Sequence, residues 1–246
     1  MAQVCLTLQY DGTQYHGWQV QPNGVTVQQV LQDAIQTVTG IRASVTGCSR
    51  TDSGVHARHF YCTTVLPERF PPEQFVKALN ANLPRDIVVS ACVPVEEDFH
   101  PRYSAVKKRY VYYIWNGAVR NPFWEKYSLH HRNKLDEKSM NETASLFVGT
   151  YDFSAFCSSA SEVQDKVRTI YRADVLRDGD LICFTIEGNG FLYNMVRIIV
   201  GTILEVETGK LSRQTVYQAL TSGNRQHAGL TSPACGLFLD EVFYTH

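Results

Sequence analysis

The chain has 246 residues, of which 44% are hydrophobic and 19% are charged, and its formal net charge is −1 at pH 7. This composition is typical of a globular protein that buries a sizeable core, and it excludes an intrinsically disordered chain. The near-zero net charge by itself gives no reason to expect a nucleic-acid partner.

Several further classes are disfavoured by the pattern of the residues. No apolar run is long enough to span a bilayer, and the N-terminus lacks the basic and apolar regions of a signal peptide. The seven cysteines are scattered singly, which favours reduced thiols in a cytoplasmic protein over a disulfide scaffold or a cysteine-based zinc site. His56 and His59 have no third ligand at a metal-like spacing, so we expect no metal site there.

The first hundred residues predict strand, helix, strand, strand, helix and strand. Alternating apolar residues from Val4 to Tyr10 indicate a strand, and an apolar stripe from Val27 to Val38 indicates a helix that Thr26 caps and Gly40 ends. The remaining elements are expected at 43–45, 59–65, 71–81 and 87–95. This order is typical of a ferredoxin-like unit, with residues 96–98 as a linker.

The second half predicts a similar mixture of strands and helices. We expect strands at 109–115, 169–176, 181–187 and 238–244, and helices at 136–148, 191–207 and 212–223. Strands and helices do not alternate regularly, which favours an α+β fold with a largely antiparallel sheet flanked by helices over a doubly wound fold. The predicted organisation is two ferredoxin-like (RRM-like) subdomains, residues 1–98 and 99–246.

A short loop around Asp52 is the strongest candidate for chemistry. Arg50 lies two residues before this carboxylate and Gly54 two residues after it. A carboxylate on a stiff turn beside a cation can act as a nucleophile or a base. Asp-Ser-Gly is also ordinary turn chemistry, so spacing alone leaves a purely structural turn open.

Residues 100–134 form a basic stretch that is interleaved with aromatic rings. Eight Lys or Arg and one acid, Glu125, occur in this stretch. Such a mixture is typical of RNA binding, in which phosphates meet cations and bases meet rings. We expect most of the rings to be core residues, and we expect Lys107, Lys108 and Arg109 to contact phosphate.

Several ordered motifs resemble the TruA family of tRNA pseudouridine synthases. The resemblance covers most of the chain, and its segments are Tyr10–Gln19, Arg50–Ala57, Asn80–Pro84, Phe99–Arg102, Arg109-Tyr110, Phe191–Arg197 and Gly236–Leu239. It implies a pseudouridine synthase fold and the isomerisation of uridine to pseudouridine at positions 38, 39 and 40 of the tRNA anticodon stem-loop. It also implies a homodimer in the cytoplasm that needs no cofactor.

The resemblance implies roles for individual residues. Asp52 would be the nucleophile in a cleft between two subdomains, and Tyr110 would stack on the target uracil. Arg197 would be the charge partner of Asp52, since an arginine among Val196 and Ile198 is costly to bury alone. Arg50 would assist at the RNA.

Phe191 and Leu192 would form the apolar wall of the same pocket. One position departs from the family pattern, because Ser49 replaces the usual glycine before Arg50, which puts the conformation of this loop in question.

Two other functions fit parts of the sequence. An RNA-binding module would use the basic aromatic stretch and would need no catalytic Asp52. A nucleoside hydrolase would need two cooperating carboxylates, and the motifs supply one.

Overall fold

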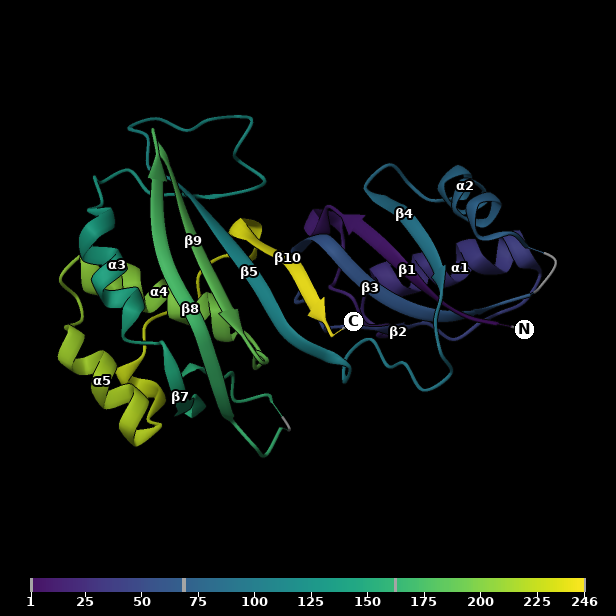
Figure 1. The fold of residues 1–246 in the computed structure, drawn as a ribbon. Coiled ribbons are helices and arrows are strands. Elements are labelled where there is room, and N and C mark those ends of the chain that lie inside the picture. Colours follow the sequence, from purple (N-terminus) through teal and green to yellow (C-terminus); the bar gives the residue numbers. More distant parts are fainter. Residues whose placement is uncertain (1, 68–69, 162, 246) are drawn as a thin grey trace. The chain divides into compact units, whose positions relative to one another are not determined.

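The computed structural model describes residues 2–67, 70–161 and 163–245, and it divides the chain into two compact units (Figure 1). Met1–Val106 and Phe238–His246 form the first unit, and Lys107–Leu237 form the second. Each unit combines a mostly antiparallel sheet with helices, which confirms the predicted α+β class.

The first unit has a ferredoxin-like strand order. Its elements are β1 (Ala2–Tyr10), η1 (Gly12–Gln14), α1 (Val27–Thr39), β2 (Thr46–Gly47), β3 (His56–Leu66), α2 (Pro72–Asn82), β4 (Ile87–Pro94) and β10 (Leu237–Tyr244). β1 pairs antiparallel with both β3 and β4, and β2 pairs antiparallel with β3. The resulting order, β4-β1-β3-β2, is that of the predicted unit.

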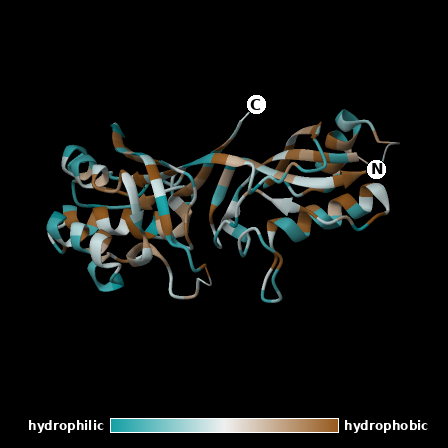
Figure 2. Cartoon of the chain, turned by 60° about the horizontal axis from the view of Figure 1, so that its bottom comes forward, coloured by the Kyte–Doolittle hydropathy of each residue, from teal (hydrophilic) through white to brown (hydrophobic). Residues whose placement is uncertain are grey.

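Helix α1 forms where its caps and its apolar stripe predict it. The Thr26 hydroxyl accepts a hydrogen bond from the amide of Gln29 at 3.4 Å, and Gly40 ends the helix with a φ of 76°. Leu31 and Ile35, one turn apart, are fully buried on the same face. The helices in Figure 2 accordingly carry both hydrophobic and hydrophilic stretches.

The strands on either side of the Asp52 loop differ from their predicted positions. β2 contains two residues, Thr46 and Gly47, just after the range expected, and β3 begins at His56, three residues earlier than expected. The early start has a tertiary cause, because His56 pairs in parallel with Phe238 of β10. A partner 182 residues away extends the strand up to the Asp52 loop, and local sequence carries no sign of it.

The second unit is built around a four-stranded antiparallel path, β5-β9-β8-β7. Its elements are β5 (Ala105–Trp115), β6 (Leu129–His130), α3 (Glu137–Ser145), β7 (Gly149–Asp152), η2 (Ser154–Phe156), β8 (Val167–Asp178), β9 (Leu181–Gly188), α4 (Met195–Glu207), α5 (Arg213–Ser222), η3 (Arg225–His227) and η4 (Ala234–Gly236). β6 pairs in parallel with the end of β5. The predicted hairpin of β8 and β9 is confirmed, with Gly179 at a φ of 58° in its turn.

Two helix boundaries in this unit were predicted wrongly. α4 begins at Met195, whereas the apolar pattern indicated a start near Phe191. Asn194 has a φ of 61°, a left-handed conformation that interrupts a right-handed helix. α3 ends at Ser145, three residues before the predicted Val148, because the amides that follow bond to carbonyls three residues back.

Candidate functional site

The Asp52 loop ends in a tight turn, residues 52–55, which we call the aspartate turn. The amide of Val55 donates to the carbonyl of Asp52 at 3.1 Å, and Gly54 adopts a φ of 78°. This is the conformation that the spacing of Asp52 and Gly54 predicts. Asp52 is half-buried, and Arg50, two residues before the turn, is exposed.

Ser49 does not strain the approach to this turn. Among the residues that the structure describes, Asn194 is the single non-glycine residue with a positive φ. Ser49 therefore has an ordinary backbone conformation, and the question raised by its side chain is resolved. Cys48, just before it, is fully buried, and its amide bonds to the carbonyl of Tyr61 at 2.8 Å.

In the second unit, β5 and the segment after β9 bring two aromatic rings together. Tyr110, which is 6% exposed, lies edge-on to Phe191, with ring centroids 5.0 Å apart and an interplanar angle of 78°. Leu192 beside Phe191 is buried as well. Phe191 and Leu192 precede the helix instead of forming its first turn, and this leaves the Phe191 ring against Tyr110.

Arg197 lies in the first turns of α4, where backbone and side-chain oxygens hold its guanidinium. Its Nε donates to the carbonyl of Ser232 at 2.8 Å, and its Nη1 donates to Oδ1 of Asn194 at 2.8 Å. The amide of Ser232 bonds back to the carbonyl of Arg197 at 3.1 Å. Asn194, with its left-handed backbone, and the distant Ser232 thus fix the orientation of the planar Arg197 guanidinium.

Tyr112 of strand β5 bonds to the residue next to Ser232, which holds the Arg197 guanidinium. Its hydroxyl donates to the carbonyl of Pro233 at 2.8 Å. Burial raises the pKa of Tyr112 well above its usual value, with a further contribution from Cys235, while the nearby charge of Arg197 acts in the opposite direction. Tyr112 lies two residues after Tyr110 on the same face of β5, so Tyr110 and Arg197 both belong to one region of the second unit.

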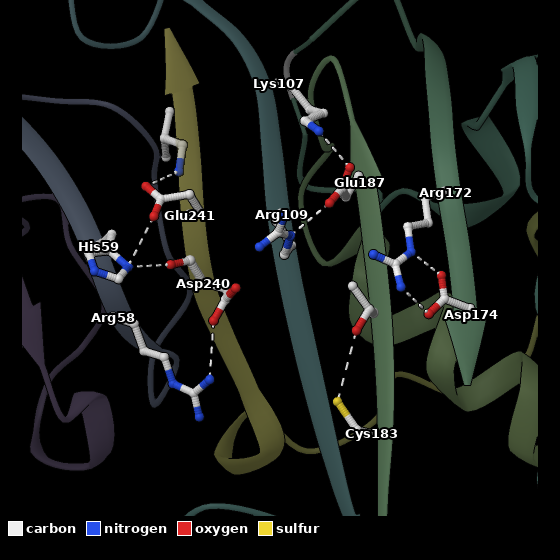
Figure 3. Close-up of polar contacts among 12 residues, drawn as sticks. Arg58, His59, Lys107, Arg109, Arg172, Asp174, Cys183, Glu187, Asp240 and Glu241 are labelled. Atoms are coloured by element: carbon white, nitrogen blue, oxygen red, sulfur yellow. Dashed lines mark hydrogen bonds and ion pairs between the residues drawn. The ribbon is translucent and has the colours of Figure 1, made fainter. Parts of the chain in front are cut away.

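The basic cluster Lys107-Lys108-Arg109 is divided between the two faces of β5. Lys107 Nζ and Arg109 Nε bond to the two carboxylate oxygens of Glu187, each at 2.7 Å (Figure 3). The strand alternation sends Lys108 to the opposite face, where it is 8% exposed. Lys107 and Arg109 therefore share the carboxylate of Glu187.

This ion-pair group gives a prediction for stability against pH. Burial alone raises the pKa of Glu187, but hydrogen bonds from Lys107 and Arg109 outweigh burial and hold that pKa below its usual value. A lowered carboxyl pKa stabilises the fold above the unfolded-state pKa, and this stabilisation is lost as the pH falls through the folded-state pKa. We expect Glu187→Gln to cost about 1–2 kcal/mol of unfolding free energy at neutral pH.

The cost should shrink toward zero in acid, below the ordinary glutamate pKa of 4.5. Urea denaturation of wild type and variant across this pH range measures it. Glu142→Gln is the matched control, because Glu142 pairs with Arg213 at 2.8 Å but is 66% exposed, and we expect a change close to zero. An equal cost for Glu187→Gln at both ends of the range would contradict the ion-pair explanation.

Sequence reasoning named several of these residues and missed others. Asp52 and Arg50 lie in the first unit, and the remaining predicted site residues lie in the second, with Tyr110 against Phe191 and Lys107 with Arg109 on one carboxylate. It missed Asn194, Ser232 and Glu187, which hold the predicted cations. The one local sign available was the asparagine itself, because asparagine adopts the left-handed conformation more readily than most other residues.

The described parts of the chain contain neither a metal-binding group nor a membrane-spanning helix. No three His, Cys, Asp or Glu side chains gather there into a group that would hold a metal ion. None of the helices in residues 2–67, 70–161 and 163–245 combines the length and apolar character needed to cross a bilayer.

Known proteins resemble the chain over nearly its whole length. A family described as tRNA pseudouridine synthase matches residues 7–104 and 143–245. A tRNA pseudouridine synthase A of Thermoanaerobacter sp. (strain X514) is 46% identical over 244 residues, which cover 99% of this chain and 100% of that protein.

The tRNA pseudouridine synthase A of Acetivibrio thermocellus is also 46% identical, with the same coverage. The tRNA pseudouridine synthase A 2 of Clostridium perfringens is 41% identical over 99% of this chain and 100% of that protein. The ranges matched by the family contain Asp52, Phe191 and Arg197, and Tyr110 lies between them.

Proposed function

Because the chain belongs to the tRNA pseudouridine synthase family, we propose that it converts uridines 38, 39 and 40 of the tRNA anticodon stem-loop to pseudouridine, with Asp52 as nucleophile. Members of this family are isomerases that act on tRNA. The observation that carries the assignment of Asp52 is the aspartate turn, a half-buried carboxylate held by a backbone hydrogen bond at a glycine-dependent bend.

The chemistry needs no net oxidation or reduction. The bond between C1′ of the ribose and N1 of uracil breaks, a bond from C1′ to C5 forms, the proton on C5 leaves to water, and N1 takes up a proton from water. A carboxylate can promote this isomerisation by attacking the nucleoside or by removing a proton from it. An isomerisation of this kind requires no metal or cofactor, and we propose that the enzyme uses none.

Residues of the second unit would bind the target nucleotide. In this proposal Tyr110 stacks on the extruded uracil, and Phe191 and Leu192 form the apolar wall behind it. Arg197 is the charge partner of Asp52, and Arg50 faces the RNA. The edge-on contact of Tyr110 with Phe191 supports a shared aromatic surface, and the hydrogen bonds from Arg197 to Ser232 and Asn194 support a fixed cation.

The basic cluster would contact the phosphate backbone. Lys107 and Arg109 remain 30% and 31% exposed while they bond to Glu187, so each can also reach a phosphate oxygen. Lys108, on the other face of β5, belongs to the same proposal. Contacts of this kind position an RNA without reading its sequence.

The proposal also covers the subdomains, the oligomeric state and the location of the enzyme. Residues 1–98 would carry the catalytic aspartate, and residues 99–246 would carry the base-stacking tyrosine and the helix of Arg197. We propose that the enzyme is a cytoplasmic homodimer that receives the anticodon arm of tRNA in a cleft between these subdomains. Size-exclusion chromatography with light scattering tests the dimer.

Product analysis tests the function itself. The substrate is a full-length tRNA with tritium at C5 of the anticodon-arm uracils. We expect tritium to appear in water while the uracil stays in the RNA as pseudouridine. Release of free uracil would instead identify a hydrolase, and binding without either product would identify an RNA-binding module. Modification confined to another part of the tRNA would contradict the assigned positions.

The role of Tyr110 gives a further prediction. Tyr110→Leu keeps an apolar side chain on β5 but removes the ring, so we expect kcat/KM to fall roughly 10- to 100-fold, the usual worth of base stacking. Tyr110→Phe keeps the ring and should retain tRNA affinity.

Tyr113→Leu is the matched control, since Tyr113 lies on the same strand and faces the opposite way. For all three variants, the tritium-release assay gives kcat/KM and a separate binding assay gives the tRNA affinity. Equal losses for Tyr110→Leu and Tyr113→Leu would show that the effect comes from the strand and not from stacking.

A further inference from the structure

A short segment that begins at the last residue of β1 holds the loop of Asp52 through backbone hydrogen bonds. We call this segment, residues 10–18, the clamp segment. The amide of Trp18 donates to the carbonyl of Thr51 at 3.2 Å, and the amide of Gly54 donates to the carbonyl of Tyr15 at 3.2 Å. These bonds lie on both sides of the catalytic aspartate, so the clamp segment restrains the loop before and after that residue.

Two glycines of the clamp segment allow this close approach. A Cβ on Gly17 would lie 2.4 Å from the carbonyl oxygen of Thr51, and one on Gly12 would lie 2.0 Å from that of Val55. Real Cβ atoms do not approach an oxygen so closely, so a side chain at either position would displace the loop. Gly17 also has a φ of 80°, a conformation that glycine adopts without steric cost.

A buried hydrogen bond makes a third link. The hydroxyl of Tyr10 lies 2.8 Å from the hydroxyl of Thr51, and the two residues are 4% and 7% exposed. The Tyr10 ring stacks on Trp18, with centroids 6.5 Å apart, and the Trp18 ring packs at 4.0 Å on Phe60 of β3. The residue next to Asp52 is thereby tied to the core of the first unit.

We propose that Tyr10 and Gly17 are positioning residues, which hold the Asp52 carboxylate at the place from which it reacts. This role rests on the proposed function of Asp52 as the nucleophile, and it assigns to the clamp segment the task of holding that residue in place. A reacting group must be held to within a fraction of an ångström, and its precision comes from rigid neighbouring contacts. Neither residue needs to touch the RNA, so each acts on turnover through Asp52.

The decisive experiment compares two alanine variants of left-handed glycines. Gly17→Ala places a methyl group against the Thr51 carbonyl, whereas a Cβ on Gly40, with a φ of 76° at the end of α1, meets nothing within 4 Å. Both variants bear similar backbone strain from the positive φ, and Gly17→Ala adds the steric clash, so Gly17→Ala should lose more stability than Gly40→Ala. We expect Gly17→Ala to lower kcat roughly 10- to 100-fold with unchanged tRNA affinity, and Gly40→Ala to turn over like wild type.

A milder pair of variants keeps the inference testable if Gly17→Ala does not fold. Tyr10→Phe and Thr51→Val each delete one hydroxyl of the buried hydrogen bond. If both act through that bond, the double variant should lose no more kcat than the more damaging single variant. Additive losses, or losses in tRNA affinity with kcat unchanged, would overturn the positioning role of Tyr10.

Asp52→Asn separates this inference from the proposed function. If Asp52→Asn is inactive but Gly17→Ala and Gly40→Ala turn over equally, the clamp is wrong and the nucleophile stands. If Asp52→Asn retains tritium release at the wild-type rate, the nucleophile itself is wrong. If Gly17→Ala loses tRNA binding and keeps kcat, the segment contacts RNA and does not position the carboxylate.

Discussion

Asp52→Asn is expected to abolish tritium release from the anticodon-arm uracils while the protein stays folded and binds tRNA. Asparagine has nearly the same shape as aspartate, and the hydrogen bond that closes the aspartate turn uses the backbone carbonyl of residue 52. The turn should therefore persist without an ionised carboxylate. Loss of a nucleophile costs roughly 1,000-fold or more in kcat.

The control for this variant is Asp33→Asn, which makes the same chemical change on an exposed position of α1. Circular dichroism and filter binding would establish that both variants fold and bind tRNA. A wild-type rate for Asp52→Asn would refute the assignment, and a small loss equal to that of Asp33→Asn would do the same.

Arg197→Ala is expected to reduce activity roughly 100-fold and to cost about 1–3 kcal/mol of stability. The stability cost follows from the structure, because Oδ1 of Asn194 and the carbonyl of Ser232 lose their donor. Arg197→Lys keeps the charge but cannot reproduce the planar pair of donors, so it should recover part of the activity.

The pH–rate profile distinguishes a catalytic effect of Arg197 from loss of structure. If the guanidinium keeps the nucleophile ionised, its removal should move the acid limb of the kcat profile to higher pH. Arg213→Ala is the matched control, since Arg213 also bonds to several oxygens in the same unit, those of Ser139, Thr143 and Glu142. It should lower stability and leave the acid limb in place. Equal profiles for the two variants would contradict the charge-partner role.

Local signals were reliable because their physical causes act over a few residues. The hydroxyl of Thr26 caps α1, Ser212 and Gly223 bound α5, and Gly54 takes the positive φ that its turn needs. Each of these effects depends on neighbours within about one helical turn, so the sequence pattern predicts them directly. The α+β class followed from the order of such elements.

The same reasoning was wrong where a distant contact overrides the local pattern. Phe191 and Leu192 continue the apolar stripe of α4, yet the chain turns at Asn194 and places the Phe191 ring against Tyr110. β3 begins early because β10 pairs with it. A hydrophobic residue satisfies a helical stripe and a pocket wall equally well, so its periodicity cannot distinguish them.

By itself, then, the sequence determined the class of fold, the family and the tight turn that presents Asp52. The tertiary structure alone decided the partners of the candidate residues and of their neighbours. Tyr10 bonds to Thr51, 41 residues away, Arg197 to Ser232, 35 residues away, and Lys107 to Glu187, 80 residues away. Turns and caps are set by neighbouring residues and can be predicted from a pattern. Contacts between segments far apart arise only when the whole core packs, so their partners appear only in the folded chain.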